Sequence, residues 1–236
     1  VTITDVQLMP AGTYIPKVTG NEINGLPAFC LIAATIRPTL QSDIKIELWM
    51  PQNNWNGRLL GTGNGGGAGK ILYGSLAGGL KKGYATVQTD MGTSRGGANG
   101  AVGQPEVWAD FGYRATHLMT VISKAFVKVY YGKAQHHAYF VGCSTGGQQA
   151  LMEAQRFPGD YNGIIAGAPA NNRTHLHTGF LLNYKSTNQE GKPLFTNQDL
   201  NFISHKIIST YVQQRGGAPG VQFLTDPGIV TVDFDS

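Results

Sequence analysis

One serine in the sequence stands on a glycine-rich corner, in the segment "YFVGCSTGGQQALMEAQ" of residues 139–155. Residues 142–146 read Gly-Cys-Ser-Thr-Gly and match the pattern G-x-S-x-G, with an apolar run before them and a helical pattern after them. A strand, a sharp turn and a helix in this order form a nucleophile elbow, in which the serine hydroxyl projects from a sheet toward the substrate. The pattern therefore predicts that Ser144 is a nucleophile, against the alternative of a plain glycine-rich turn.

Such a nucleophile needs backbone N–H groups nearby to stabilise the oxyanion of a tetrahedral intermediate. The first is expected from Thr145, at the start of the predicted helix. The second is expected from the glycine-rich loop "GTGNGGGAG" of residues 61–69, which follows an earlier strand. A phosphate-binding loop is the competing interpretation, but no Lys-Ser or Lys-Thr pair follows at P-loop spacing and the dinucleotide-binding pattern is only weakly matched.

A base and an acid that complete a Ser-His-Asp triad should follow the serine in the sequence. A local triad built from "THLHTG" at residues 174–179 is conceivable, but an isolated surface histidine is more often a hydrogen-bonded loop residue. His-x-His without a third ligand is a weak signal for zinc, so no metal site is predicted. His117 is expected to be a packed or capping residue of a long helix. The downstream candidates are His175, His177, His205, Asp160, Glu190, Asp199, Asp226, Asp233 and Asp235.

The elements that must position these groups alternate between strands and helices. Apolar runs predict strands at 28–39, 43–51, 58–60, 84–90, 138–143 and within 161–170. Helical spacing predicts helices at 107–132, 146–158 and 197–214, with a looser pattern at 71–83. This order predicts a doubly wound, mostly parallel α/β sheet over about residues 57–170, with functional groups at the C-terminal ends of its strands. After Ala170 the pattern predicts loops and the last helix only.

Composition limits the classes of function. The 236 residues include 33 glycines, about twice the usual share, and only 14% are charged. The net charge of +4 comes from scattered basic residues rather than a basic stripe, which argues against nucleic-acid binding. No run approaches the ~20 apolar residues of a membrane span, so no membrane partner is expected. The opening "VTITDVQLMP" has no signal-peptide pattern and is interpreted as a mature or trimmed start.

Two cysteines and one sequon bear on the cellular compartment. Cys30 and Cys143 could bond to each other, stay free or pair with groups outside this chain, and their spacing does not decide between these alternatives. Residues 172–174 read Asn-Arg-Thr, a glycosylation sequon that has meaning only in a secreted protein. Asn172 is therefore a candidate glycosylation site.

Several longer motifs agree in order and spacing with one known family. The segments "WNGRLLGTGNGGGAG", "GYATVQTDMG", "DFGYRATH" and "YFVGCSTGGQQALMEAQRFPGDYNGIIAGAPA" together resemble the tannase and feruloyl esterase family, over roughly residues 30–235. The resemblance implies an α/β-hydrolase core that carries a lid. It also implies hydrolysis of phenolic-acid esters through a Ser-His-Asp triad.

The resemblance assigns roles to particular residues. Ser144 corresponds to the nucleophile, and Thr145 with Gly65 and Gly66 corresponds to the oxyanion hole. Cys143 corresponds to a cysteine that, in this family, is disulfide-bonded to a cysteine beside the catalytic histidine. No cofactor is implied. A calcium site in the lid is not expected, because the segment "YVQQRGGAPGVQFLTDP" has no cysteine and a single acidic residue.

The resemblance also predicts the domain organisation. Residues 1–170 are expected to form the N-terminal part of the hydrolase core, and residues 171–236 the beginning of the lid. The family places the catalytic acid and base beyond the lid. We therefore expect both groups outside this chain, either on a second polypeptide from the same precursor or in a region that the sequence does not contain.

The leading functional hypothesis is a secreted serine esterase that cleaves feruloyl-type or galloyl-type esters of plant polymers through an acyl-enzyme. Tyr73, Trp108 and Phe180 are expected to line the phenolic pocket. One alternative is an intracellular biosynthetic hydrolase or acyltransferase of the same fold, which the scarcity of cysteines favours. The other is a non-catalytic pseudoenzyme, which the missing acid and base would permit.

Overall fold

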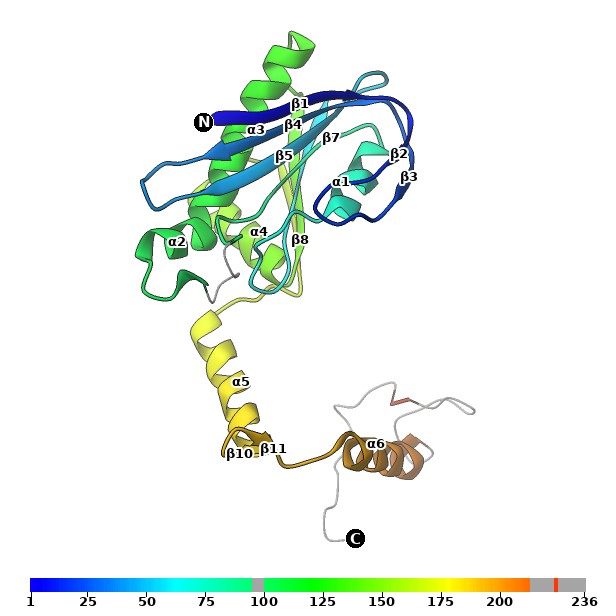
Figure 1. Ribbon diagram of the computed structural model, residues 1–236, viewed down its shortest axis with the longest axis vertical. Helices are drawn as coiled ribbons and strands as arrows, with labels where there is room; N and C mark the ends of the chain where they lie inside the picture. The colour runs from blue at the N-terminus through cyan, green and yellow to red at the C-terminus, as the bar shows by residue number, and fades with distance from the viewer. Residues whose placement is uncertain (95–99, 213–222, 225–236) are drawn as a thin grey trace. The chain divides into compact units, whose positions relative to one another are not determined.

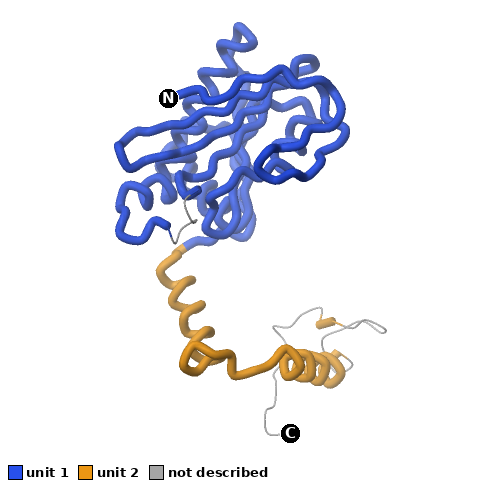
Figure 2. The backbone as a smooth tube through the Cα atoms, viewed as in Figure 1, with its two compact units in different colours: residues 1–171 blue, residues 172–236 orange. Residues whose placement is uncertain are grey.

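The chain folds into two compact units. The computed structural model describes residues 1–94, 100–212 and 223–224. Residues 1–171 form unit 1 and residues 172–236 belong to unit 2, coloured blue and orange in Figure 2. The division falls between Asn171 and Asn172.

Unit 1 is built on a seven-stranded sheet with the strand order β1-β4-β5-β7-β6-β8-β9 (Figure 1). Strand β6 pairs in parallel with β7 and β8, and β8 pairs in parallel with β9, whereas β1, β4 and β5 join the sheet antiparallel. The parallel arrangement predicted for residues 57–170 is confirmed. The strands are β1 Thr2–Met9, β4 Phe29–Ile36, β5 Ile44–Pro51, β6 Arg58–Thr62, β7 Ala85–Thr89, β8 His137–Cys143 and β9 Gly163–Gly167.

Helices cover both faces of this sheet because its strands are apolar on both faces. Residues Cys30, Ile32 and Ala34 of β4 belong to one hydrophobic cluster, and Phe29 and Leu31 belong to another. Since neighbouring residues of a strand point to opposite faces, the two clusters lie on opposite sides of the sheet. The helices of unit 1 are α1 Tyr73–Leu80, α2 Pro105–Ala109, the π-helical turn η2 Asp110–Arg114, α3 Ala115–Tyr131 and α4 Thr145–Arg156.

Each cluster uses different helices. Met119 and Val127 of α3 and Ala150 of α4 pack in the larger cluster, with Phe140 of β8. Leu76 and Leu80 of α1 pack in the smaller cluster. There the fully buried Trp49 ring meets Tyr14 edge-on at 5.3 Å and stacks on Tyr73 at 6.1 Å. The sheet is thus fixed from both sides, with α4 beginning where β8 ends.

The N-terminal segment contains strands that the sequence analysis did not predict. Strand β1 pairs only with β4 and lies at the edge of the sheet. A hairpin of β2 Gly12–Tyr14 and β3 Ile23–Leu26 follows it. Strand β1 exposes Ile3, Val6 and Leu8, so the apolar residues of β1 do not mark a buried face. This pattern explains why the sequence analysis missed β1.

The single helix predicted at 107–132 is interrupted. Helix α2 passes into the π-helical turn η2 before α3 begins at Ala115. In this turn the fully buried Asp110 carboxylate accepts a hydrogen bond from Arg114 Nε at 2.6 Å. Arg114 also forms an ion pair with Glu106 at 2.8 Å and donates to the Ser42 hydroxyl at 3.0 Å. The turn therefore carries a charged network that joins α2 to the loop before β5.

Unit 2 differs from the prediction of loops after Ala170. A helix, α5, spans Arg173–Thr187, and two short strands follow, β10 Asn188–Gln189 and β11 Lys192–Pro193. None of the residues of α5 is buried. The sequence of this helix therefore lacks the regular spacing of apolar residues by which a helix is predicted. Helix α6 spans Asn197–Tyr211, where the start at residue 197 is as predicted. The last two residues of the predicted helix, 213 and 214, lie outside the described residues.

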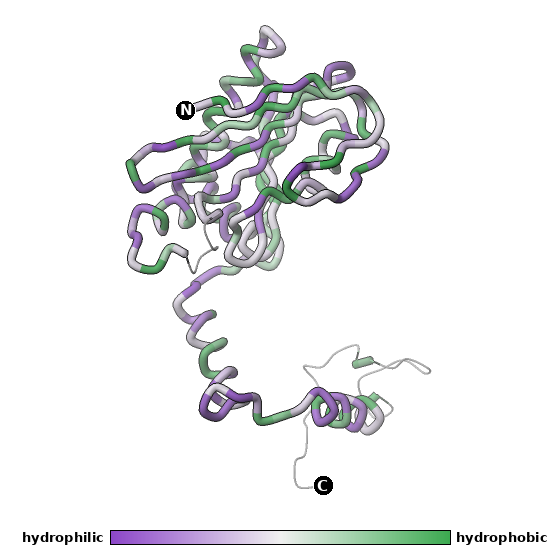
Figure 3. The backbone as a smooth tube through the Cα atoms, viewed as in Figure 1, coloured by the Kyte–Doolittle hydropathy of each residue, from purple (hydrophilic) through white to green (hydrophobic). Residues whose placement is uncertain are grey.

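The start of α6 has a clear local cause. Thr196 and Asp199 form a capping box, in which the Asp199 N–H donates to the Thr196 hydroxyl and the Thr196 N–H donates to the Asp199 carboxylate. Figure 3 shows a hydrophobic stretch within α5, and its exposed members are Phe180, Leu181 and Leu182. Among the described residues, no helix is both long enough and apolar enough to cross a membrane.

The Arg114 network gives the first testable prediction. We expect Arg114→Met to lower the free energy of unfolding by about 3 kcal/mol, because it leaves the buried Asp110 carboxylate without its cation. The control is Arg37→Met, since the Arg37 side chain is 55% exposed in its ion pair with Asp43 and should cost less than about 1 kcal/mol. Urea unfolding of both variants measures the difference, and equal losses would contradict the prediction.

Candidate active site around Ser144

Ser144 is the single residue between β8, which ends at Cys143, and α4, which begins at Thr145. Its backbone has φ 60° and ψ −117°, a combination that residues with a side chain rarely adopt and that costs on the order of 1–3 kcal/mol. The Ser144 side chain is exposed. The strand therefore passes into the helix through one strained residue, which is the local geometry that the G-x-S-x-G pattern predicts.

Backbone hydrogen bonds hold this strained residue from both sides. The Ser144 N–H donates to the Gly167 carbonyl at 3.1 Å, and the Ser144 carbonyl accepts from Ala170 N–H at 2.8 Å and from Gln148 N–H at 3.1 Å. Gly167 and Ala170 belong to the end of β9 and the loop after it. The turn is thus fixed to the neighbouring strand as well as to its own helix.

Three glycines allow the glycine-rich loop after β6 to lie against this turn. A Cβ atom on Gly142 would stand 2.2 Å from the Gly146 carbonyl oxygen, and one on Gly63 would stand 2.5 Å from Gly146 Cα. Both distances are too short for any side chain. Two backbone hydrogen bonds join the loop to the turn. The Gly146 N–H donates to the Asn64 carbonyl at 2.8 Å, and the Gly63 N–H donates to the Val141 carbonyl at 2.9 Å.

Asn64 and Gln149 fix the loop to α4 through buried side chains. The Gln149 carbonyl oxygen Oε1 accepts from the Asn64 N–H at 2.8 Å, and Gln149 Nε2 donates to Asn64 Oδ1 at 3.2 Å and to the Thr116 hydroxyl at 2.8 Å. Asn64 Nδ2 also donates to the Thr89 carbonyl at the end of β7. The sequence analysis did not identify either residue. The available signal was weak, namely one asparagine between glycines and one glutamine on the buried face of a helix.

The predicted oxyanion-hole residues lie on the two sides of this contact. Thr145 is buried as the first residue of α4, and its hydroxyl donates to the Gly66 carbonyl at 2.6 Å. Gly66 has a φ of 57°, and a Cβ on Gly65 or Gly66 would meet no heavy atom within 4 Å. The loop glycines therefore border open space, while the helix start beside them carries backbone N–H groups that lack partners within the helix.

An open groove of about 560 Å³ lies beside the turn. Backbone and small side chains form much of its wall, and three parallel strands contribute their C-terminal ends, which is where ligands bind in open α/β sheets. Among its apolar lining residues, Val141 and Ile165 are 37% and 66% exposed. The groove is lined by Leu60, Thr62, Gly63, Asn64, Gly65, Leu72, Ser75, Val141, Gly142, Cys143, Ile165 and Gly167.

Two of the three aromatic residues that were expected to line the phenolic pocket, Tyr73 and Trp108, do not line this groove. Tyr73 lines a separate cavity of about 410 Å³ with Tyr14 and Glu47, on the side of the sheet that α1 covers. Trp108 of α2 is exposed and meets Phe111 edge-on. Phe180 lies on α5 in unit 2. Position in the sequence alone did not show which face of the sheet each ring occupies.

The structure does not bring a histidine to the serine within unit 1. Among the described residues of that unit, none donates to or accepts from the Ser144 hydroxyl. His175, His177 and His205 lie in unit 2, on α5 and α6. Of the acidic candidates, Glu190 and Asp199 lie in unit 2 and Asp160 in unit 1, whereas Asp226, Asp233 and Asp235 lie outside the described residues.

Other predicted residues are placed as follows. Cys143 is exposed in the groove and Cys30 is buried, and both thiols are free. Burial raises the pKa of the Cys30 thiol. Asn172 is exposed, just before the first residue of α5. His117 packs on α3, where its ring stacks on Phe157 at 3.9 Å.

The contact between the turn and the loop can be tested with one methyl group. We expect Gly142→Ala to lower the free energy of unfolding by about 3 kcal/mol, because its Cβ has no room beside the Gly146 carbonyl. Gly74→Ala is the matched control. A Cβ on Gly74 meets nothing within 4 Å, and the added alanine should leave α1 as stable or up to ~1 kcal/mol more stable. Thermal and urea unfolding measure both variants, and a harmless Gly142→Ala would refute the close approach.

Comparisons with known proteins fit this geometry. The family model described as "Tannase and feruloyl esterase" matches residues 30–220. An uncharacterised esterase of Xanthomonas campestris pv. campestris is 41% identical over 199 residues, which cover 83% of this chain and 34% of that protein. A probable feruloyl esterase B-1 of Aspergillus fumigatus is 34% identical over 227 residues, which cover 92% of this chain and 43% of that protein.

Two solved structures are similar to the described fold. The crystal structure of feruloyl esterase B from Aspergillus oryzae has a TM-score of 0.81 at 33% identity, covering 89% of this chain and 42% of that chain. The tannin acyl hydrolase from Aspergillus niger has a TM-score of 0.67 at 24% identity, covering 89% of this chain and 40% of that chain, and it supports the fold alone. This chain thus spans less than half the length of these relatives.

Proposed function

Since this chain belongs to the tannase and feruloyl esterase family, we propose that it is the nucleophile-bearing part of a carboxylic ester hydrolase. The observation that carries the proposal is the strained turn at Ser144, which lies between a strand and a helix and beside an open groove. Backbone strain of this kind persists where the surrounding structure enforces it, and it is common at active sites.

The proposed reaction follows from the groups around the turn. The Ser144 oxygen attacks the ester carbonyl carbon as its proton passes to a base, and the carbonyl oxygen becomes an oxyanion. The N–H groups of Thr145 and of Gly65 or Gly66 bind this oxyanion. Collapse of the intermediate releases the alcohol and leaves an acyl-enzyme, which water then hydrolyses to the free acid and Ser144. No cofactor takes part in these steps.

The substrate class is proposed from the names of the relatives. The relatives above 30% identity include proteins named feruloyl esterase, and this name describes the acyl group of a phenolic acid. We assign the chain to phenolic esters of plant material and to a secreted enzyme, in which Asn172 is exposed for glycosylation.

The catalytic base and acid are proposed to come from further polypeptide of the same protein. The relatives are more than twice as long as the matched segment. Strand β9 lies at the edge of the sheet, and it exposes Ile165 beside the half-exposed Val141 of β8. An apolar sheet face next to a nucleophile is suited to be covered by another core element. That element would bring the histidine and the aspartate to Ser144.

Unit 2 is proposed to be the beginning of a lid. Helices α5 and α6 have no buried residues, and α5 exposes the apolar side chains Phe180, Leu181 and Leu182. Apolar helix faces of this kind bury their surface against other elements in a folded protein. The proposed covering element is the remainder of the lid.

Two substitutions of the serine test the proposed nucleophile. Ser144→Ala should lower kcat/KM on methyl ferulate and methyl gallate at least about a thousand-fold, because no acyl-enzyme forms. Ser144→Gly should lose the activity too, yet raise the free energy of unfolding by about 1 kcal/mol, because glycine tolerates a φ of 60°.

A fluorophosphonate label, located by peptide mapping, provides the control for these measurements. It should be found on Ser144 in the unmodified protein and on no residue of the Ser144→Ala variant. A fully active Ser144→Ala variant, or an intact protein that fails to react with the label, would refute the assignment and favour a non-catalytic role.

The exposed cysteine tests the second polypeptide. The resemblance to the family implies that Cys143 forms a disulfide with a cysteine of that polypeptide, and Cys143 is exposed in the groove, where such a bond can form. Reduction, or Cys143→Ser, should then release a second species on a denaturing gel and lower the melting temperature. Cys30→Ser is the control, because Cys30 is 3% exposed and cannot reach outside the core. A single 25.2 kDa species with full esterase activity before and after reduction would contradict this proposal.

A further inference from the structure

A cluster of three ionisable side chains, one of them buried and two partly buried, lies away from the serine. It consists of His117 on α3, Glu153 on α4 and Asp160 in the segment between α4 and β9. One ligand atom from each residue lies within 4.8 Å of the others. Glu153 is nine residues beyond Ser144 along α4, or about 13 Å at 1.5 Å per residue. The cluster therefore takes no part in the ester hydrolysis proposed above.

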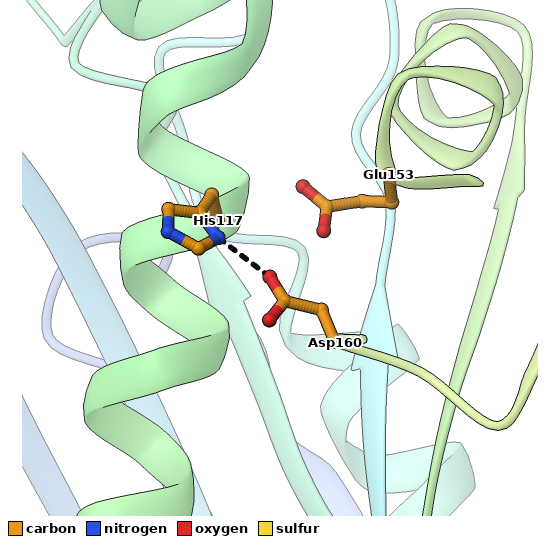
Figure 4. Close-up of side chains that lie close together, drawn as sticks. All are labelled: His117, Glu153 and Asp160. Atoms are coloured by element: carbon orange, nitrogen blue, oxygen red, sulfur yellow. Dashed lines mark hydrogen bonds and ion pairs between the residues drawn. The ribbon is translucent and has the colours of Figure 1, made fainter. Parts of the chain in front are cut away.

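The feature that distinguishes this cluster from an ordinary ion pair is Glu153. Its side chain is 0% exposed, and neither of its carboxylate oxygens has a hydrogen-bond partner among the described residues. Figure 4 shows the Glu153 carboxylate pointing toward the other two side chains, while His117 and Asp160 are joined by a contact of 2.6 Å from Nδ1 to Oδ2. A buried carboxylate without a partner is costly, so its retention calls for a ligand or a proton.

The charges around Glu153 favour a cation at this place. Burial, followed by the charge of Asp160, raises the pKa of Glu153 to about 8. Lys124 is the nearest cationic side chain, but its ammonium donates to the backbone carbonyls of Gly159 and Asp160, and within the described residues it pairs with neither carboxylate. Tyr161 is engaged with the Thr120 hydroxyl. Asp160 thus has a partner in His117, whereas Glu153 has beside it the carboxyl group of Asp160, to which it can hydrogen-bond when it is protonated.

We propose that His117, Glu153 and Asp160 form a binding site for a divalent transition-metal ion of the zinc type. One imidazole nitrogen and two carboxylates are a donor set that such ions accept, whereas calcium and magnesium prefer oxygen ligands alone. Three protein ligands leave a coordination position for water. His117 and Asp160 are 29% and 13% exposed, so an ion can enter from solvent.

Binding would replace two existing interactions. The ion takes the place of the contact between His117 Nδ1 and Asp160 Oδ2, and it displaces the proton of Glu153, which is released to solvent. The bound ion would connect α3, α4 and the segment before β9. Its role is therefore structural, and occupancy should raise the melting temperature rather than change the chemistry at Ser144.

The test titrates Zn²⁺ into the chelator-treated intact protein at pH 7. We expect one ion to bind per chain, to raise the melting temperature by about 3 °C or more at saturation, and to release close to one proton. Calorimetry in buffers of different ionisation enthalpy measures the proton. Glu153→Gln and His117→Asn should each abolish these effects, and the partly exposed His117 provides a variant that should fold even if Glu153→Gln does not.

One control separates this site from the other histidine pair of the chain. The double variant His175→Asn, His177→Asn should keep the zinc response, because it removes the other histidine pair and leaves the three proposed ligands in place. A response that survives Glu153→Gln and His117→Asn overturns the proposal, and so does the absence of any response in the unmodified protein.

The pH dependence distinguishes the metal from a shared proton. The unfolded chain ionises Glu153 near pH 4.5 and the folded protein near pH 8, so without metal the stability should fall as the pH rises across this window. Saturating Zn²⁺ should remove that fall in the unmodified protein. If Zn²⁺ leaves the profile unchanged and Glu153→Gln alone flattens it, the cluster holds a proton and not a metal, and the proposal is wrong.

Discussion

The structure depends on a backbone-to-backbone contact between two segments that are far apart in the sequence. Gly63, in the loop after β6, and Gly142, at the end of β8, both approach Gly146 at distances that exclude a side chain. Only this approach brings the loop, the strand end and the helix start to one place. The strain at Ser144 is tolerated because hydrogen bonds to Gly167 of β9, to Ala170 in the loop after β9 and to Gln148 of α4 surround it. Glycine is thus used here for its lack of volume more than for its flexibility.

The sheet supplies the rigidity that this contact requires. Apolar side chains alternate along β4 and β5, so that each strand contributes to both hydrophobic clusters. Helix α4 packs in the larger cluster and begins at the turn. The side chain of Gln149 on this helix forms hydrogen bonds with Asn64 of the loop after β6. Buried polar groups with complete hydrogen bonding define one arrangement where apolar packing alone would permit several. The unpartnered Glu153 is the exception on the same helix.

Much of the fold could be predicted from the sequence, and the reasons are physical. The parallel strands of residues 57–170 were found because they are short apolar runs between helical patterns, and the turn at Ser144 because its five-residue pattern encodes local geometry. Helix α5 was missed because it buries no residue and so carries no period. The site was only partly predictable. Asn64, Gln149 and the group formed by His117, Glu153 and Asp160 depend on which elements become neighbours, and no local pattern records that.

The placement of Asn64 against Gln149 has a consequence for how the protein acquires its shape. These two residues are 85 positions apart in the chain, and the ordering of the strands puts β6 between two strands that are made after it. Such a contact forms only after a long loop of the chain has closed. The conformational entropy of that loop is lost before the hydrogen bonds form, and contacts of this kind therefore slow folding. The Ser144 corner therefore cannot assemble from its own seventeen-residue neighbourhood. It needs the pairing of β6 with β8, which places Gly63 and Asn64 beside Val141 and Gly146.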